Sequence, residues 1–218
     1  MRIFIDTASI DEIKEAHALG ILDGVTTNPS LMAKEGITGK DNIIDHYKRI
    51  CEIVDGDVSA EVISTDFEGM VREGEELAKI HDNIIVKVPM TVDGVKAIHH
   101  LYENDIPTNC TLVFSAAQAI LAAKAGAYLV SPFIGRIDDT NWEGMDLIDQ
   151  IAEVYAIQDF ETEILAASIR SSKHIVQCAQ AGADVVTCPL STIKGLFKHP
   201  LTDIGLEKFL ADYRKGNS

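Results

Sequence analysis

The stretch IIVKVP (84–89) is apolar and rich in β-branched residues except for one lysine, Lys87. A run of this length and composition is typical of a strand that is covered on both faces. Seven more runs of this kind recur along the chain, in alternation with segments that carry helical signals. They are RIFID (2–6), GVTTN (24–28), VSAEV (58–62), TNCTLVF (108–114), AYLVSPF (127–133), EILAASI (163–169) and ADVVTCP (183–189).

The segments between these runs predict helices. Apolar residues at helical spacing form one stripe from Ile43 to Val54 and another from Met145 to Tyr155. A Ser or Thr followed three residues later by Glu or Gln favours a helix start, because the two side chains can satisfy the first free amides. This pattern occurs at Ser9, Thr65, Ser115 and Thr140.

Eight successive β-then-α units favour a single (β/α)8 TIM barrel domain over residues 1–218. An open doubly wound sheet fits the same pattern, because periodicity does not show whether a sheet closes. Residues 203–218 predict an extra C-terminal helix, which either caps its own barrel or packs on a neighbouring subunit. Its apolar side chains are Ile204, Leu206, Phe209, Leu210 and Tyr213.

The charge and the hydropathy pattern limit the partners of this chain. Its formal net charge is −15, from 19 basic and 34 acidic side chains. That field repels phosphate backbones, so we expect no nucleic-acid partner. No apolar run is long enough for a transmembrane helix, and the N-terminus becomes acidic at once. We therefore expect neither a membrane partner nor a secretory signal.

The cysteines and histidines indicate neither a disulfide framework nor a metal site. Cys51, Cys110, Cys178 and Cys188 are widely separated, as is typical of reduced interior thiols in a cytoplasmic protein. No histidine stands at a strand end with a second ligand nearby, which disfavours zinc catalysis. Glycine-rich nucleotide motifs are missing as well. We expect a cytoplasmic location and no cofactor.

Polar side chains gather at the C-terminal ends of the predicted strands, where barrel enzymes carry their chemistry. Seven of the eight units supply a polar or reactive group there, inside or at the edge of an apolar run. These groups are Asp6, Thr26, Thr27, Asn28, Glu61, Lys87, Asn109, Thr111, Ser131, Arg136, Ser168 and Arg170. This concentration predicts a functional site.

Lys87 is the most informative of these residues, because it interrupts an otherwise apolar strand. A buried ammonium must be paired or partly neutral. One interpretation is a structural ion pair with Asp6 or Glu61. The other is a desolvated amine that attacks a carbonyl and forms a Schiff base. The second interpretation fails if the Lys87 side chain points towards the surrounding helices.

The charged neighbours of Lys87 each have two interpretations. Asp6 and Glu61 could move the protons that imine chemistry requires, or they could cap a helix and pair with Lys87. Arg136 and Arg170 could bind a substrate phosphate through their planar guanidinium groups. The commoner role of an Arg in an acidic protein is a surface salt bridge.

Several of these motifs together resemble the small transaldolase group, which also contains fructose-6-phosphate aldolase. The resemblance spans nearly the whole chain, with the motifs in the expected order. They are FIDTAS (4–9), GVTTNPS (24–30), AEV (60–62), VKVPMT (86–91), NCTLVFS (109–115), SPFIGR (131–136) and AASIR (166–170).

The resemblance implies a role for each candidate residue. Lys87 would form the Schiff base with a ketose phosphate, and Asp6 would handle the proton on the hydroxyl beside the breaking bond. Glu61 and Thr111 would hold the water used to make and hydrolyse the imine. The dihydroxyacetone unit would be oriented by Asn28, Asn109 and Ser131, with Thr27 nearby. The phosphate would be bound by Arg136, Ser168 and Arg170.

The reaction implied is transfer of a three-carbon unit from fructose 6-phosphate to erythrose 4-phosphate, which gives sedoheptulose 7-phosphate and glyceraldehyde 3-phosphate. No metal or organic cofactor is implied. Phe133 and Glu61 match the transaldolase branch, because the aldolase branch has Tyr and Gln at these positions. The resemblance also implies a homo-oligomer, a pentamer or a decamer, in which the C-terminal helix reaches a neighbour.

Other functions remain open from the residues. A direct aldolase or a deoxyribose-phosphate-type lyase would use the same imine chemistry. A sugar-phosphate isomerase or epimerase would use Lys87 only as an electrostatic helper. A ring-forming barrel without activity would need none of the polar strand ends.

Overall fold

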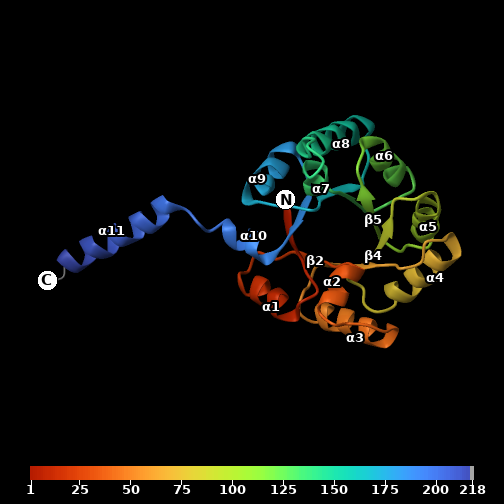
Figure 1. Ribbon diagram of the computed structural model, residues 1–218, viewed down its shortest axis with the longest axis horizontal. Coiled ribbons are helices and arrows are strands. Elements are labelled where there is room, and N and C mark those ends of the chain that lie inside the picture. Colours follow the sequence, from red (N-terminus) through yellow and green to blue (C-terminus); the bar gives the residue numbers. More distant parts are fainter. Residues whose placement is uncertain (217–218) are drawn as a thin grey trace.

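The computed structural model, which describes residues 1–216, is a closed barrel of eight parallel strands surrounded by helices (Figure 1). The strands follow one another in sequence order, and β1 pairs with β8 to close the sheet. The strands are β1 (Arg2–Asp6), β2 (Gly24–Thr26), β3 (Asp57–Glu61), β4 (Ile84–Pro89), β5 (Thr108–Val113), β6 (Leu129–Pro132), β7 (Glu163–Ala166) and β8 (Val185–Cys188). The predicted TIM barrel is confirmed, and the open sheet is excluded.

Helices follow the strands in the order that the sequence predicted, and all but the last of them lie around the outside of the barrel. They are α1 (Ile10–Ala18), α2 (Pro29–Lys34), α3 (Lys40–Cys51), α4 (Phe67–Ala78), α5 (Val92–Tyr102), α6 (Ala116–Lys124), α7 (Ile134–Asp138), α8 (Met145–Gln158), α9 (Ser172–Ala181), α10 (Leu190–Gly195) and α11 (Pro200–Gly216). In the described part of the chain, no helix is both long and apolar enough to span a membrane.

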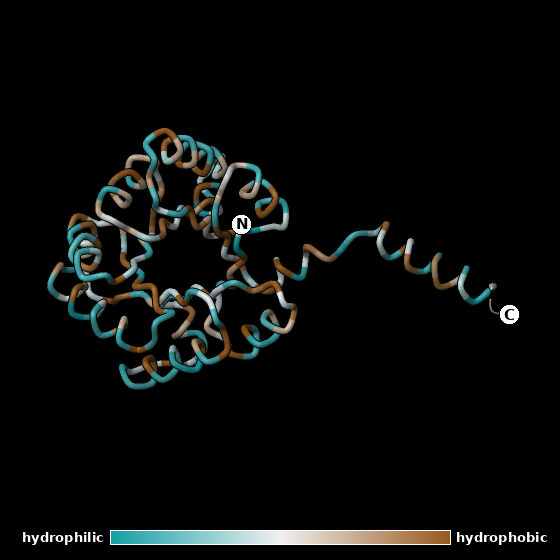
Figure 2. The backbone as a smooth tube through the Cα atoms, turned by 180° about the vertical axis from the view of Figure 1, so that it is seen from behind, coloured by the Kyte–Doolittle hydropathy of each residue, from teal (hydrophilic) through white to brown (hydrophobic). Residues whose placement is uncertain are grey.

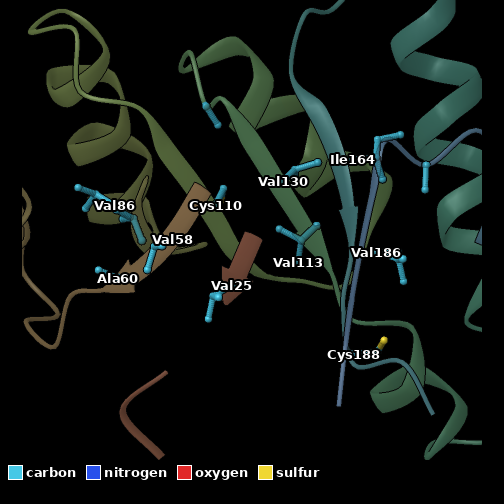
Figure 3. Close-up of a cluster of buried hydrophobic side chains, with 14 of the residues drawn as sticks. Val25, Val58, Ala60, Val86, Cys110, Val113, Val130, Ile164, Val186 and Cys188 are labelled. Atoms are coloured by element: carbon cyan, nitrogen blue, oxygen red, sulfur yellow. The ribbon is translucent and has the colours of Figure 1, made fainter. Parts of the chain in front are cut away.

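Alternation along the strands divides the apolar core into two layers. Side chains such as Val58, Val86 and Val130 point outward and pack against the helices (Figure 3). The intervening residues point into the barrel, because successive side chains of a strand face opposite ways. They form a second buried cluster of Phe4, Ile85, Leu129, Leu165, Ala167 and Val185. The barrel interior is therefore packed, not hollow.

A close approach inside the barrel explains one glycine. A Cβ atom on Gly24 would lie 2.6 Å from the ring of Phe4 and 2.6 Å from the carbonyl oxygen of Asp57. At the N-terminal end of the barrel, the guanidinium of Arg2 pairs with Asp57 at 2.7 Å and also with Glu163. This charged group closes the end of the barrel opposite to the strand ends predicted to carry chemistry.

Two of the four predicted helix starts are correct. Ser9 and Ser115 are N-cap residues, and the Ser115 hydroxyl accepts from the amide of Gln118 at 3.3 Å. The start at Thr65 is wrong by one residue, because the side chain of Asp66 caps α4 instead. The start at Thr140 is also wrong, because its hydroxyl donates to a backbone carbonyl and α8 begins later, after Gly144.

The C-terminal helix α11 extends away from the barrel (Figure 1). It begins at Pro200, three residues before the predicted start, and none of its residues is buried. Polar and apolar residues alternate along it (Figure 2). It does not cap its own barrel, and its apolar residues Ile204, Leu206, Phe209 and Leu210 are exposed. Asn217 and Ser218, which the prediction included in this helix, lie outside the described residues.

Candidate active site

The C-terminal mouth of the barrel brings the predicted residues together. On three strands a polar group stands two residues beyond a buried inner side chain, on the same face: Asp6 follows Phe4, Lys87 follows Ile85, and Ser131 follows Leu129. These groups open into a cavity of about 120 Å³. The cavity is lined by Asp6, Thr26, Asn28, Lys87, Ser131, Phe133, Arg136, Ala167, Ser168 and Thr187.

Lys87 points into this mouth and is 5% exposed. Its Nζ donates to the carbonyl oxygen of Thr27 at 3.0 Å and lies 3.1 Å from Oε2 of Glu61. Strand register sets the second contact, because Glu61 and Lys87 are paired positions of β3 and β4. The side chain therefore does not point towards the surrounding helices, an orientation that would have ruled out the Schiff-base interpretation.

Asp6 stands at the end of β1 and is held by a neighbouring hydroxyl. The Thr26 hydroxyl donates to Oδ1 of Asp6 at 2.7 Å and lies 2.7 Å from the hydroxyl of Thr187. Thr26 and Thr187 are buried, whereas Asp6 is partly exposed in the cavity. One Asp6 oxygen is thus fixed, and the carboxylate faces the cavity that Lys87 enters.

A fully buried chain of hydrogen bonds crosses from β6 to β3. The hydroxyl of Ser131 donates to Oδ1 of Asn109 at 2.7 Å, and Nδ2 of Asn109 donates to the hydroxyl of Ser59 at 3.1 Å. All three residues are at most 1% exposed. These bonds fix the orientation of the Asn109 amide beside Lys87, its paired position on β4.

Thr111 differs from these neighbours because its buried hydroxyl has no partner. Within residues 1–216, only two buried side-chain polar atoms lack a hydrogen bond, and they are the hydroxyls of Thr111 and Thr108. The side chain of Thr111 falls on the same face of β5 as that of Asn109, because the two residues are two positions apart along the strand. A buried hydroxyl of this kind can hold a water molecule or a ligand atom.

The segments after β6 and β7 form the other wall of the cavity. Backbone amides of Ile134 and Gly135 donate to the carbonyls of Ala167 and Ser168, both at 3.1 Å. Ser168 adopts a left-handed conformation, with φ of 60°. A Cβ atom on Gly135 would lie 2.1 Å from the Ser168 carbonyl oxygen, so only glycine fits there. These contacts set the position of the next residue, Arg136.

Aromatic contacts orient the two remaining residues of this wall. The guanidinium of Arg136 lies 5.0 Å from the centroid of the Phe133 ring, a cation–π contact. Phe133 packs edge-on against Phe114, with centroids 5.7 Å apart. Phe133 therefore presents to the cavity a ring that has no hydrogen-bonding group.

Three predicted residues are placed differently from the rest. Arg170 is exposed and pairs with Asp139 at 2.7 Å, so its guanidinium is engaged outside the cavity. The Thr27 hydroxyl turns away from the cavity, and only the Thr27 carbonyl reaches Lys87. Asn28 lines the cavity, but its Oδ1 accepts from the amide of Leu31 and caps α2.

Sequence reasoning placed Thr26 only among the polar strand ends, and it gave no role to Ser59 or Thr187. Each lies inside a predicted apolar run, and each is on the inward face. The alternation was a usable signal for Ser59, because it precedes Glu61 by two residues. The same spacing relates Thr187 to the inner residue Val185. Tyr47 lies within the apolar stripe predicted from Ile43 to Val54, and its hydroxyl contacts Thr27.

The arrangement is suited to carbonyl chemistry on an anionic substrate. A primary amine, two carboxylates and several hydroxyls converge at the mouth, and Arg136 supplies a cation at its edge. Within residues 1–216, no three His, Cys, Asp or Glu side chains are grouped as metal ligands. The four cysteines are buried and free, as predicted. Burial, with a smaller contribution from nearby Asp6, raises the pKa of the Cys188 thiol to about 12.

Known proteins share this sequence over its whole length. The profile of the family "Transaldolase/Fructose-6-phosphate aldolase" matches residues 3–216. Proteins named "Probable transaldolase" from Cytophaga hutchinsonii and Phocaeicola vulgatus are each 65% identical over 217 residues, covering 100% of both chains. A protein of the same name from Flavobacterium psychrophilum is 62% identical over 217 residues.

Solved structures with the same fold are more distant in sequence. Thiamine phosphate pyrophosphorylase from Pyrococcus furiosus has a TM-score of 0.60 at 14% identity, covering 85% of this chain and 84% of that one. Inosine 5′-monophosphate dehydrogenase from Legionella pneumophila has a TM-score of 0.59 at 17% identity, covering 87% of this chain and 58% of the other. At these identities the likeness concerns the fold alone.

Proposed function

Since this chain belongs to the transaldolase/fructose-6-phosphate aldolase family, we propose that it is a transaldolase that works through a Schiff base on Lys87. It transfers a dihydroxyacetone unit from a ketose phosphate, fructose 6-phosphate or sedoheptulose 7-phosphate, to an aldose phosphate, erythrose 4-phosphate or glyceraldehyde 3-phosphate. The observation that carries this proposal is the buried Lys87 amine, which lies 3.1 Å from Glu61 and opens into the cavity lined by Asp6 and Arg136.

The reaction begins when the Lys87 amine attacks the ketone carbon of the donor. Nζ must first lose a proton, and the Glu61 carboxylate is within hydrogen-bond distance to accept it. The resulting carbinolamine loses its hydroxyl as water when Glu61 returns that proton. The partnerless hydroxyl of Thr111 is suited to hold this water, which later hydrolyses the imine. Glu61 thus accepts a proton from the amine before the attack and returns it when water leaves.

Asp6 then breaks the carbon–carbon bond by removing a proton. It accepts the proton from the C4 hydroxyl of the donor, the C3–C4 bond cleaves, and the bonding electrons move into the iminium to form an enamine. The aldose product leaves, and the three-carbon unit stays on Lys87. The acceptor aldehyde enters, the enamine attacks it, and Asp6 returns the proton. Fixation of one Asp6 oxygen by Thr26 supports this role.

The remaining residues bind the two ends of the substrate. Ser131, Asn109 and Asn28 orient the hydroxyls of the dihydroxyacetone unit beside Lys87. Arg136 and Ser168 bind the phosphate at the wall formed after β6 and β7. Arg170 joins them only by leaving Asp139, since their present contact is 2.7 Å. Thr27 acts through its carbonyl, and Phe133 closes the cavity as an apolar ring.

The requirement for an acceptor distinguishes a transaldolase from a direct aldolase, the alternative within this family. Purified protein is incubated with fructose 6-phosphate, with and without erythrose 4-phosphate. We expect sedoheptulose 7-phosphate with the acceptor and little free dihydroxyacetone without it. Equal cleavage of the donor without an acceptor would contradict the transferase assignment. Isomerised donor in place of either product would indicate an isomerase.

We also propose a cellular setting and an assembly state for this enzyme. We place it in the cytoplasm, in the exchange of sugar phosphates of the pentose phosphate pathway, as a homo-oligomer. Exposed apolar residues of α11 support assembly, since Phe209 is 73% and Ile204 is 59% exposed. Light scattering of the full chain and of a chain ending at residue 199 tests this. A mass unchanged by the truncation would contradict a role of α11 in assembly.

A further inference from the structure

The position of the Lys87 amine depends on two neighbours. Its Nζ contacts the Thr27 carbonyl at 3.0 Å and Oε2 of Glu61 at 3.1 Å. Glu61 is a paired position of the sheet, but β2 ends at Thr26, so Thr27 lies beyond the regular ladder. The amide of Thr27 keeps only a long bond to the Ser59 carbonyl, at 3.3 Å. The Thr27 carbonyl therefore needs another anchor to face Lys87.

Tyr47 supplies that anchor from α3. Its hydroxyl lies 2.9 Å from the hydroxyl of Thr27, and the residue is 2% exposed. The Thr27 hydroxyl donates its one proton to the Ser59 carbonyl at 3.1 Å, so Tyr47 must be the donor to Thr27. The Thr27 hydroxyl is thus fixed twice, as a donor to the Ser59 carbonyl and as an acceptor from the Tyr47 hydroxyl.

The charge of Glu61 also acts on this phenol. Burial raises the pKa of Tyr47 to about 12, so the phenol keeps the proton that it donates to Thr27. The Glu61 carboxylate raises this pKa as well, which places it within electrostatic reach of the phenol. One hydroxyl on α3 is therefore bonded to one of the two residues that hold the Lys87 ammonium and lies within electrostatic reach of the other.

We infer that Tyr47 is a positioning residue for the Schiff-base lysine, an inference that rests on the proposed function. Its hydroxyl fixes Thr27, and through the Thr27 carbonyl it aims Lys87 Nζ at the substrate ketone. Tyr47 itself is not among the residues that line the cavity. Loss of its hydroxyl should therefore slow imine formation and leave donor binding nearly unchanged.

The test compares two variants that each lose one buried tyrosine hydroxyl. Tyr47→Phe keeps the ring in the core. Tyr155→Phe is the matched control, because the hydroxyl of Tyr155 donates to the Ala119 carbonyl at 2.7 Å, between α8 and α6 and away from the cavity. The readouts are kcat, KM for fructose 6-phosphate, and the rate at which borohydride traps the donor on the protein. The melting temperature of each variant measures the purely structural cost.

A misaimed nucleophile should lower kcat and the trapping rate of Tyr47→Phe about tenfold or more, with KM changed less than about threefold. Tyr155→Phe should stay within about twofold of wild type in all three, although its melting temperature falls comparably. Thr27→Val, which breaks the same link, should reproduce the defect of Tyr47→Phe, and the double variant should add little to it.

The outcomes separate this inference from the proposed function. If the wild-type protein traps no donor at all, both are wrong. If wild type traps the donor and Tyr47→Phe traps it as fast as Tyr155→Phe does, the positioning role alone is wrong. A Tyr47→Phe variant in which only KM rises would also overturn it. If Tyr47→Phe does not fold, Thr27→Val decides by the same criteria.

Discussion

Replacement of Asn109 by alanine should cost more stability than any exposed asparagine can. Asn109 accepts from Ser131 at 2.7 Å and donates to Ser59 at 3.1 Å, and all three residues are at most 1% exposed. The Asn109→Ala variant leaves two serine hydroxyls buried without their partner. Each unsatisfied buried group costs about 1–3 kcal/mol, so the loss is about 3 kcal/mol in total.

Thermal unfolding at a fixed protein concentration measures this loss, since assembly would make the midpoint depend on concentration. A chain of this size loses about 2–4 °C in melting temperature per kcal/mol, which gives a decrease of about 6–12 °C. The activity of Asn109→Ala should fall too, because the amide orients the dihydroxyacetone unit in the proposed function.

Asn104→Ala is the control for this experiment. Nδ2 of Asn104 donates to the His100 carbonyl at 2.7 Å, but the residue is exposed, so water can replace the bond. Its change in stability should stay within about 0.5 kcal/mol. If Asn109→Ala and Asn104→Ala melt at the same temperature, the chain of buried hydrogen bonds does not stabilise the mouth of the barrel, and the reasoning is refuted.

Three further expectations concern the cavity and the core. Thr111→Val removes a hydroxyl that has no partner, so its melting temperature should stay within about 2 °C of wild type. Its kcat should still fall about a hundredfold, and full activity would show that this hydroxyl holds no water that the reaction needs. Gly135→Ala forces a Cβ to within 2.1 Å of the Ser168 carbonyl, so kcat/KM for fructose 6-phosphate should fall about tenfold or more; an unchanged value would argue against a phosphate site at this wall. Burial raises the pKa of Cys110 to about 12, and it raises the pKa of the other three thiols likewise. The unfolded thiols lose their protons near pH 8.5, so the free energy of unfolding should fall as pH rises from about 9 towards 12, whereas a flat profile in urea titrations would contradict this.

Phe133 offers a separate test of the branch of the family. Phe133→Tyr places a phenol in the cavity, where it can hold a water molecule near the enamine on Lys87. We expect faster release of dihydroxyacetone when no acceptor is present, measured by a coupled dehydrogenase assay. Unchanged release would show that the apolar ring of Phe133 does not protect the intermediate.

Much of the fold could be predicted because the barrel strands have a strong local signal. Runs such as IIVKVP are buried on both faces, so nearly every residue is apolar, and the exception at Lys87 marks the site. Helix starts were harder, because two candidate caps stand side by side at Thr65 and Asp66. Only the backbone geometry at that turn decides which side chain reaches the first free amides.

The gathering of these polar residues at one end of the barrel was predictable, but the contacts among them were not. Glu61 and Lys87 stand near the C-terminal ends of their apolar runs, which placed both at the mouth of the barrel. Their pairing follows from the register of β3 and β4. The orientation of Thr27 could not be read from the sequence, because the chain leaves the ladder after Thr26. The contact between Arg170 and Asp139 joins two segments 31 residues apart, which no local pattern reports.

The identity of the nucleophile can be tested by trapping the intermediate. Wild-type protein is incubated with fructose 6-phosphate and borohydride, digested, and analysed by mass spectrometry, with Lys96→Met as a variant that lacks an exposed lysine instead. We expect an adduct on the peptide that contains Lys87, kept in Lys96→Met and lost together with turnover in Lys87→Met. An adduct on another lysine, or a Lys87→Met enzyme that still turns over, would contradict the assignment of Lys87.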